Sequence, residues 1–380
     1  MSLAPQTPWI KSSTAFSRTA SQASHGKKKS QLPYRVAVMI PMCGAAGMWA
    51  PSCIASAEAA VKELNAQSGI DHRPVEMIVV DAAIEAERPC AIVIDDLIQT
   101  QMIDAIVGMH ISAVRQMIAR VLRGRIPFVY TPLYEGGEAS PGVFTIGDTP
   151  ARQLGPAIRY MSHRFKLKKW ALIGNDYIWP RASHAYAKRY LQHHHHELVF
   201  ERYLPFSSPE MARAVEALGK SGADGVLISL IGQDAVEFNR IFGAMDLHRK
   251  MFRLSCIVEE NGLLASGAHN LDRLFSSASY FAALNTEENA QFRETYHNLH
   301  QHRAPMLNAL GQSTYEGFHF LASMVAHRGE PWGLPGAATS PPIRYKSARH
   351  GVYRSNAGNG SSVYLARANG FVFDDFQHLS

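Results

Sequence analysis

Short apolar runs alternate with amphipathic stretches along most of the chain, and this alternation limits the fold more than any other feature. The first cycle has an apolar run at 35–41 and an amphipathic stretch at 52–67, in which Ala57, Val61 and Leu64 share one face. Short apolar runs predict buried strands, and a 3.6-residue periodicity predicts helices. Strand–helix alternation is typical of α/β folds with parallel sheets.

Similar cycles follow in two series, which meet at a proline-containing joint after residue 147. The predicted strands are 75–81, 105–108, 127–130 and 142–147 in the first series, and 169–174, 199–204, 225–230 and 252–257 in the second. The predicted helices are 89–100, 112–123, 153–165, 186–194, 209–221 and 235–245. Two such halves predict two lobes with a cleft, and open α/β sheets bind ligands beyond the carboxyl ends of their strands.

The last third of the chain does not continue this regular alternation of strands and helices. It contains a predicted strand at 274–280, helices at 286–302 and 308–328, and a loop at 329–342. Short predicted strands follow around Tyr345 and at 352–354, 363–366 and 371–373, with glycine-rich turns between them. Short strands with such turns predict an antiparallel edge added to the second lobe.

The net charge of +6 comes almost entirely from residues 1–33, which hold five Lys or Arg residues and no acid. The near-neutral remainder does not suggest nucleic-acid binding, which needs clustered basic groups. The tail is rich in Ser, Thr, Gln and Lys, so we expect it to be disordered. It lacks an apolar signal core, so the sequence as written predicts a cytoplasmic protein, or a periplasmic one if the start is misassigned.

The cysteines and histidines do not form a metal site. Cys43, Cys53, Cys90 and Cys256 fit neither a dense disulfide framework nor a zinc-ligand spacing. Cys43 and Cys53 flank the first strand–helix turn, and are either a disulfide in an exported protein or two unreactive thiols. The four histidines of 193–196 point around a helix and cannot converge on one ion.

No cofactor and no catalytic group is predicted. The glycines of 44–47 lack the full dinucleotide-binding fingerprint and its acidic partner. Ser, His and Asp residues are present, but no nucleophile-elbow spacing is found. The sequence therefore predicts a protein that is not an enzyme.

Several segments resemble one family. Residues 41–49 (PMCGAAGMW), 57–61 (AEAAV) and 65–70 are similar to the start of type I periplasmic solute-binding proteins, in particular the leucine/isoleucine/valine-binding branch. Residues 130–136 (YTPLYEG) and 174–181 (GNDYIWPR) resemble the amide- and urea-binding branch more closely. That branch includes the cytoplasmic amide sensor that controls aliphatic amidase expression. The resemblance covers about 34–370.

The resemblance implies the type I periplasmic binding protein fold, an α/β fold of two Rossmann-like lobes with parallel-sheet cores joined by a three-strand hinge. It places 34–148 and 283–328 in the first lobe, and 149–282 and 329–380 in the second. The two late helices are thereby assigned to the first lobe, which chain order alone does not indicate.

The resemblance also assigns ligand contacts at the first predicted helix starts. Ser112 follows Gly108, and its hydroxyl and nearby N–H groups would hold a carbonyl or carboxylate oxygen. The alternative is a plain N-cap serine. His110 matches an aromatic position of the amide-binding branch, and the alternative is a buried neutral histidine. Trp49 matches the aromatic residue that covers the ligand from the first lobe.

Two further turns complete the predicted site. Tyr130 and Thr131 match the second ligand-contacting turn, which Tyr134 closes, although the intervening Pro132-Leu133 departs from the amide sensor. From the second lobe, the rings of Tyr177 and Trp179 would sandwich a small flat ligand.

Two polar residues of the second lobe remain as candidates. Gln233 can both donate and accept a hydrogen bond, as an amide ligand would need. Glu260 resembles the acid that holds the amino group in amino-acid binders. The alternative for Glu259 and Glu260 is a favourable interaction with a helix dipole.

Together these features predict a non-catalytic protein that closes on a small polar ligand, namely an amide, a urea-like compound or an amino acid. The predicted role is the substrate-binding component of an ABC-type importer, whose membrane subunits would be its partners. The alternative is a cytoplasmic amide sensor that regulates gene expression through a regulatory protein. A homodimer is compatible with either role.

Overall fold

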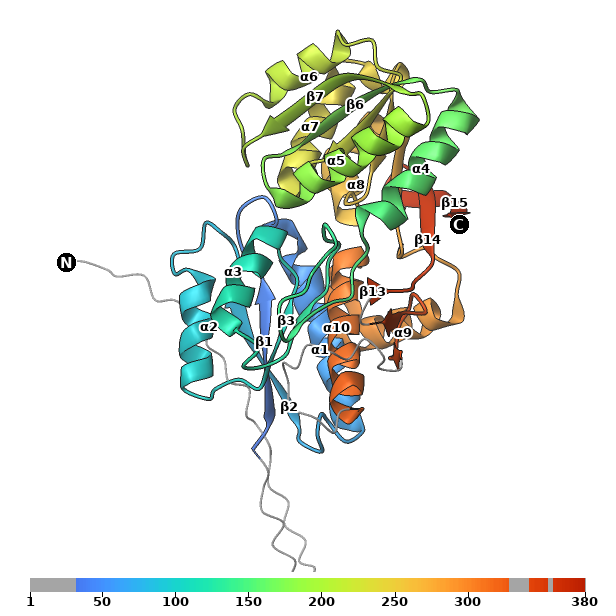
Figure 1. Cartoon of the computed structure of the whole chain (residues 1–380). Coiled ribbons are helices and arrows are strands. Elements are labelled where there is room, and N and C mark those ends of the chain that lie inside the picture. The colour runs from blue at the N-terminus through green and yellow to red at the C-terminus, as the bar shows by residue number, and fades with distance from the viewer. Residues whose placement is uncertain (1–31, 328–341, 355–357, 380) are drawn as a thin grey trace, which may run out of the picture. The chain divides into compact units, whose positions relative to one another are not determined.

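A computed structural model describes residues 32–327, 342–354 and 358–379, in an α/β fold with two sheets (Figure 1). The predicted tail (1–33) and the predicted loop (329–342) fall almost entirely outside these ranges. None of the helices in the described ranges combines the length and hydropathy that a membrane-crossing helix needs.

The first sheet has five parallel strands in the order β2-β1-β3-β4-β5. The strands are β1 Tyr34–Ile40, β2 Val75–Asp81, β3 Ala105–Gly108, β4 Phe128–Tyr130 and β5 Val143–Thr145. The helices between them are α1 Ala50–Ala66, preceded by the 3-10 turn η1 Gly47–Trp49, α2 Cys90–Gln99 and α3 Ser112–Leu122. Successive residues of β1 point to opposite faces, so Val36 and Val38 pack toward α1, while Ala37 and Met39 pack toward α2 and α3.

Two late helices pack against α1, and one of them also covers the first sheet. They are α9 Glu287–His300 and α10 Ala309–Ala326, and both pack against α1, while α10 also contacts β3 and β4 (Figure 1). Thr286 and Asn308 are the N-caps of these helices, and their side chains accept hydrogen bonds from backbone N–H groups of the first turn.

The second sheet has seven strands in the order β15-β14-β10-β9-β8-β6-β7. The parallel strands are β6 Lys169–Asn175, β7 Glu197–Leu204, β8 Gly225–Ser229, β9 Phe252–Ser255 and β10 Leu274–Ala278, and the antiparallel ones are β14 Val363–Asn369 and β15 Val372–Leu379. The helices are α4 Pro150–Phe165, α5 Ile178–His193, α6 Met211–Gly219, α7 Gly232–Ala244 and α8 Glu260–Ser266, and the remaining 3-10 turns are η2 Leu247–Arg249, η3 Ala268–Asn270 and η4 Gln301–Arg303.

Helices cover both faces of the second sheet. Trp170 and Leu172 of β6 pack in the cluster that contains α4 and α5, whereas Ala171 and Ile173 pack in the cluster that contains α6, α7 and α8. This alternation explains why the central strands β6 and β8 are apolar along most of their length. The predicted two-lobed α/β fold with parallel-sheet cores is confirmed, whereas the residue boundaries of the lobes stay a prediction.

Two details of the sequence-based prediction are wrong. Helix α5 begins at Ile178, not at residue 186, because Pro180 lies in its first turn, where proline is tolerated. Strands β11 Ile343–Arg344, β12 Val352–Arg354 and β13 Gly358–Asn359 form a separate three-stranded sheet, with β11 against α10, so only β14 and β15 extend the second sheet.

A polar cluster around Glu63 ties α1 to the late helices. The Glu63 carboxylate accepts hydrogen bonds from Thr295 Oγ1 at 2.9 Å, Tyr315 Oη at 2.5 Å and Lys346 Nζ at 2.9 Å, and His319 Nε2 lies 3.1 Å away. Burial alone would raise the pKa of Glu63, but the bonds from His319, Lys346 and Tyr315 outweigh it and hold the pKa well below its usual range.

We expect Glu63→Gln to lower the free energy of unfolding at pH 7 by about 2–4 kcal/mol, because charge-assisted hydrogen bonds are lost at a largely buried site. The low pKa means that this stabilisation is complete above about pH 5 and is lost as pH falls through the folded-state pKa. Urea denaturation at pH 7 and pH 3.5 tests this. The exposed Glu58 on the same helix provides the control, Glu58→Gln. A wild-type advantage that grows in acid would contradict the prediction.

Candidate functional site

A cavity, here called the cleft cavity, lies beyond the carboxyl ends of strands from both sheets. It is lined by Ala46, Trp49, Met109, His110, Ile111, Ser112, Tyr130, Pro132, Leu133, Tyr177, Trp179, Ile231, Ile257 and Leu310. Six of the predicted site residues are among them, and most of the other side chains are apolar.

Three helices begin at this cavity without a side-chain cap. The N-cap residues are Ile111 for α3, Tyr177 for α5 and Ile231 for α7, and none of them makes a capping hydrogen bond through its side chain. All three line the cleft cavity. The N-terminus of a helix carries unpaired N–H groups and the positive end of the helix dipole. The cavity therefore favours a negatively charged or strongly accepting ligand group.

Ser112 is the first residue of α3 and not its N-cap, so the alternative of a plain N-cap serine is wrong. Its side chain is buried, and its hydroxyl accepts a hydrogen bond from Arg115 Nη1 at 3.3 Å. The N–H groups of Ser112 and Ala113 donate to no acceptor among the described residues, because the first bonds back to Ile111 O come from Val114 and Arg115. This helix start thus offers donors to the cavity.

His110 is neutral and packed against aromatic rings. Burial lowers its pKa to about 4. Its ring lies 5.8 Å from Phe128 and 5.3 Å from Tyr130, between ring centroids, and Nδ1 lies 3.2 Å from Ile111 O. Gly108 leaves room for the imidazole, since a Cβ there would lie 2.7 Å from His110 Nε2. His110 therefore shapes the cavity wall as an uncharged ring.

The second lobe contributes the rings of Tyr177 and Trp179, with centroids 6.4 Å apart and planes inclined by 37°. Trp179 is 4% exposed, and its Nε1–H has no hydrogen-bond partner among the described residues. A buried indole N–H normally has an acceptor. A ligand oxygen in the cleft cavity would supply it.

Trp49 closes the cavity from the first lobe. Its Nε1 donates a 2.9 Å hydrogen bond to Glu259 Oε1 on the second lobe. Glu259 is the N-cap of α8, and its carboxylate also accepts from the N–H groups of Asn261 and Gly262. Burial raises the pKa of Glu259 to about 7, although these hydrogen bonds partly offset it.

Further contacts hold the two lobes together beside Trp49. The N–H of Gln233 donates to Ala45 O at 2.9 Å, and Asn261 Nδ2 donates to Met48 O at 3.4 Å. Gly232 approaches Ala45 so closely that a Cβ would lie 1.8 Å from its carbonyl oxygen. The described conformation is thus closed around the cavity.

Arg115 supports the wall formed by the segment after β4. It is buried, its Nη2 lies 2.6 Å from Glu135 Oε1, and its Nε lies 2.7 Å from Glu138 Oε2. The guanidinium also lies over the rings of Tyr130 and Tyr134, at 5.0 and 5.4 Å from their centroids. Tyr134 is therefore part of this support. Its side chain lines neither the cleft cavity nor a second cavity beside it.

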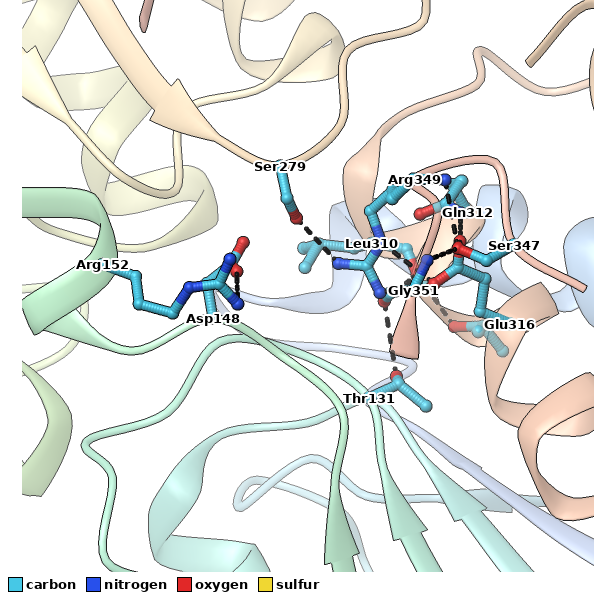
Figure 2. Close-up of polar contacts among 12 residues, drawn as sticks. Thr131, Asp148, Arg152, Ser279, Leu310, Gln312, Glu316, Ser347, Arg349 and Gly351 are labelled. Carbon is cyan, nitrogen blue, oxygen red and sulfur yellow. Dashed lines mark hydrogen bonds and ion pairs between the residues drawn. The ribbon is translucent and has the colours of Figure 1, made fainter. Parts of the chain in front are cut away.

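A second cavity, here called the hinge cavity, lies beside the three chain connections between the sheets and shares Pro132, Leu133, Ile257 and Leu310 with the cleft cavity. Its other lining residues are Thr131, Gly147, Asp148, Gln153, Cys256, Val258, Glu259, Ala278, Ser279, Tyr280, Phe281, Ala309, Ser313 and Arg349. Figure 2 shows its polar groups, with Asp148 beside Arg152 on one side and Arg349 beside Ser279 on the other. Thr131, a predicted site residue, faces this cavity.

Besides Tyr134, two predicted ligand residues line neither cavity. Gln233 is exposed, and only its backbone N–H contacts the first lobe. Glu260 is buried, and its Oε1 accepts from the N–H of Ala282 on a connection between the lobes. Burial, followed by the charge of Glu259, raises the pKa of Glu260 to about 8. The acid that lines the hinge cavity is Glu259.

Asp148, Glu259 and Arg349 line the hinge cavity but were not among the predicted ligand residues. Only one of them carries a recognisable signal in the sequence. Glu259 stands before a glycine-containing helix start, where an acidic N-cap is expected. Asp148 and Arg349 carry none, because each lies in a connection without periodicity.

The cysteines and the histidine run make no bonded site. All four cysteines are free thiols, and of the predicted pair Cys43 is exposed whereas Cys53 is buried. Within residues 32–327, 342–354 and 358–379, no three His, Cys, Asp or Glu side chains lie together in a way that would hold a metal ion.

Comparison with protein families gives a match over most of the chain. A family model described as "Periplasmic binding protein" matches residues 33–370.

Solved structures show the same fold. A solute-binding protein of an ABC transporter from Rhodopseudomonas palustris HaA2, in complex with p-hydroxybenzoic acid, is similar with a TM-score of 0.79 and 16% identity, covering 91% of this chain and 96% of that chain. The branched-chain amino acid transporter substrate-binding protein LivJ from Streptococcus pneumoniae, in complex with isoleucine, is similar with a TM-score of 0.76 and 14% identity, covering 91% of this chain and 99% of that chain. At these identities the likeness shows the fold.

Proposed function

Because the chain belongs to the periplasmic binding protein family, we propose that it is the solute-binding component of an ABC-type importer, which holds a small ligand between its lobes and catalyses no reaction. The observation that carries this proposal is the cleft cavity, to which both lobes contribute walls and across whose edge Trp49 and Glu259 are hydrogen-bonded. Closure of two lobes around a ligand is a common hinge motion of binding proteins.

The chemistry of the cavity supports a small planar carboxylate as the ligand. The uncapped starts of α3, α5 and α7 favour an anion, and the Trp179 Nε1–H and Ser112 N–H groups are donors without acceptors among the described residues. The aromatic rings of Trp49, Tyr177 and Trp179 favour a flat body. The similar Rhodopseudomonas protein was solved with p-hydroxybenzoic acid, a ligand of this kind.

The predicted amide, urea-like and amino-acid ligands rank behind a carboxylate. An amide or urea carbonyl accepts the same hydrogen bonds, but gains less from the three helix dipoles because it is neutral. An amino acid needs an acceptor for its ammonium group. Glu259, the acid at the cavity edge, already accepts hydrogen bonds from Trp49 and from the N–H groups of Asn261 and Gly262.

A ligand screen tests the proposal directly. Thermal shift with small aryl carboxylates, branched-chain amino acids, aliphatic amides and urea should show the largest rise in melting temperature with the carboxylates. Calorimetric titration then gives the Kd. A response to amides or amino acids alone would overturn the carboxylate assignment. Ammonia release from amides would overturn the non-catalytic role.

The importer role has its own readout. The ligand-loaded protein should stimulate ATP hydrolysis by its ABC transporter membrane complex in vesicles, while the ligand-free protein should not. Ligand-dependent binding to a regulatory protein, without any effect on ATP hydrolysis, would instead favour the sensor role.

We expect Trp179→Phe to weaken carboxylate binding about 5–30-fold, because it keeps an aromatic side chain but removes one hydrogen bond to a charged group. Calorimetric titration measures the change. The control is Met245→Gln at an exposed position of the same lobe, which should leave the Kd unchanged. Equal affinity of Trp179→Phe and wild type would show that the indole N–H does not contact the ligand.

We expect ligand affinity to rise as pH falls from 8 toward 5. The pKa of Glu259 is about 7 when the lobes enclose it, and an open cleft would return it toward its usual value near 4.3. Between these values the open form is ionised and the closed form is protonated, so closure takes up a proton and is favoured by acid, by up to about tenfold per pH unit.

Calorimetry in buffers of different ionisation enthalpy measures this proton uptake. Glu259→Gln should abolish the uptake, whereas Glu237→Gln, at an exposed position of α7, should leave it in place. Proton release on binding at pH 6 would contradict the expected sign.

A further inference from the structure

The hinge cavity and the cleft cavity meet at one wall. Pro132 and Leu133 of the first lobe and Ile257 of the second lobe line both, together with Leu310 at the start of α10. These four apolar residues surround the boundary between a cavity with donor groups and a cavity with charged groups. The flat apolar ring of a ligand would pack well between these four residues.

The hinge cavity contains a buried carboxylate with an unused oxygen. Asp148 is 4% exposed, and its Oδ1 accepts no hydrogen bond among the described residues. The nearest cation is Arg152, whose Nη1 lies 3.6 Å from that oxygen, beyond hydrogen-bond distance. A buried carboxylate oxygen without a donor is unfavourable, so Asp148 is a ready acceptor for a donor that enters the cavity.

Arg349 faces the same cavity, and not all of its N–H groups donate hydrogen bonds to described residues. Its Nε and Nη2 donate to Glu316 Oε2 at 2.9 and 2.6 Å, and its Nη1 donates to Ser279 Oγ at 2.9 Å (Figure 2). A guanidinium carries five N–H groups, so Nη1 and Nη2 each retain one. The hinge cavity thus presents an acceptor on one side and donors on the other.

The charges of the hinge cavity select against a charged group. Asp148 would repel a second carboxylate, and Arg349 and Arg152 would repel an ammonium group. A hydroxyl group is neutral, and it can donate to Asp148 and accept from Arg349 at once.

We propose that the two cavities are compartments of one binding site, and that the hinge compartment recognises a hydroxyl group at the far end of the ligand. The inference rests on the proposed function and extends it by naming the substrate class. The carboxylate lies at the helix starts, the ring lies between the shared apolar residues, and the hydroxyl lies between Asp148 and Arg349. The preferred ligand is a hydroxylated aryl carboxylate.

Calorimetric titration of the full chain with benzoate, 4-hydroxybenzoate and 4-methoxybenzoate tests this. The hydroxyl compound should bind at least tenfold more tightly than benzoate. The methoxy compound should lose that gain, because it cannot donate to Asp148. Asp148→Asn should reduce the preference for 4-hydroxybenzoate over benzoate to less than threefold.

The outcomes separate this inference from the proposed function. Equal affinity for benzoate and 4-hydroxybenzoate would overturn the hydroxyl site and leave the carboxylate site standing. No binding of any benzoate would overturn both. The comparison of the three ligands uses the wild-type protein, so the test holds even if Asp148→Asn fails to fold.

Discussion

Replacing Gly232 with alanine should weaken ligand binding about 100-fold, because closure is sterically blocked and the binding-competent state becomes rare. Gly232 begins α7 in the second lobe, and the Cβ of an alanine would lie 1.8 Å from the carbonyl oxygen of Ala45 in the first lobe. The oxygen is a backbone atom and the Cβ is bonded directly to the backbone, so no side-chain rotation relieves the contact. The lobes would have to separate.

The backbone of Gly232 adds a second effect that needs a control. Its φ of +48° is in the left-handed region, where alanine costs about 1–2 kcal/mol. Gly222 lies in the same lobe with a φ of +73°, and no atom lies within 4 Å of the position that a Cβ would take there. Gly222→Ala should therefore lower the melting temperature to a similar degree and leave the Kd unchanged. Wild-type affinity of Gly232→Ala would show that binding does not require this closed contact.

Glu316→Gln should lower the free energy of unfolding by about 3–5 kcal/mol, since it leaves a buried guanidinium without its counter-charge. Glu316 is fully buried in α10. Its carboxylate accepts from Arg349 at 2.6 Å and from Ser347 Oγ at 2.6 Å. Burial opposes the charge on Arg349, but Glu316 outweighs this and raises the pKa of Arg349 above its usual range.

Urea denaturation of Glu316→Gln measures the loss. The double variant Glu316→Leu/Arg349→Leu removes both charges and should be less destabilised than the single one. A single-variant loss below about 1 kcal/mol would mean that water solvates Arg349 once the carboxylate is gone.

The strands and the two-lobed architecture could be predicted because the central parallel strands are covered on both faces. Such strands are continuous apolar runs, like 169–174, and the helices between them keep a 3.6-residue pattern. Periodicity indicates only that ligand residues follow the strands, and the resemblance to solute-binding proteins then assigned the individual cavity residues. Trp49, Ser112 and Tyr177 lie where parallel strands end and helices begin.

The two predicted ligand residues of the second lobe that line neither cavity lie at helix starts. Successive residues of a helix point about 100° apart, so an offset of one residue moves a side chain to another face. Glu259 rather than Glu260 lines the hinge cavity, and the side chain of Gln233 is exposed, for this reason. The Arg349–Glu316 pair could not be predicted, because it joins a helix to a connection without periodicity.

The order of elements along the chain has a consequence for biosynthesis. The apolar face of α1 is covered by α9 and α10, and the edge of β10 is covered by β14. A ribosome releases these partners more than two hundred residues after α1 and about ninety residues after β10. Neither lobe can therefore finish folding during most of translation, and the nascent chain exposes both surfaces to chaperones until its last segments emerge.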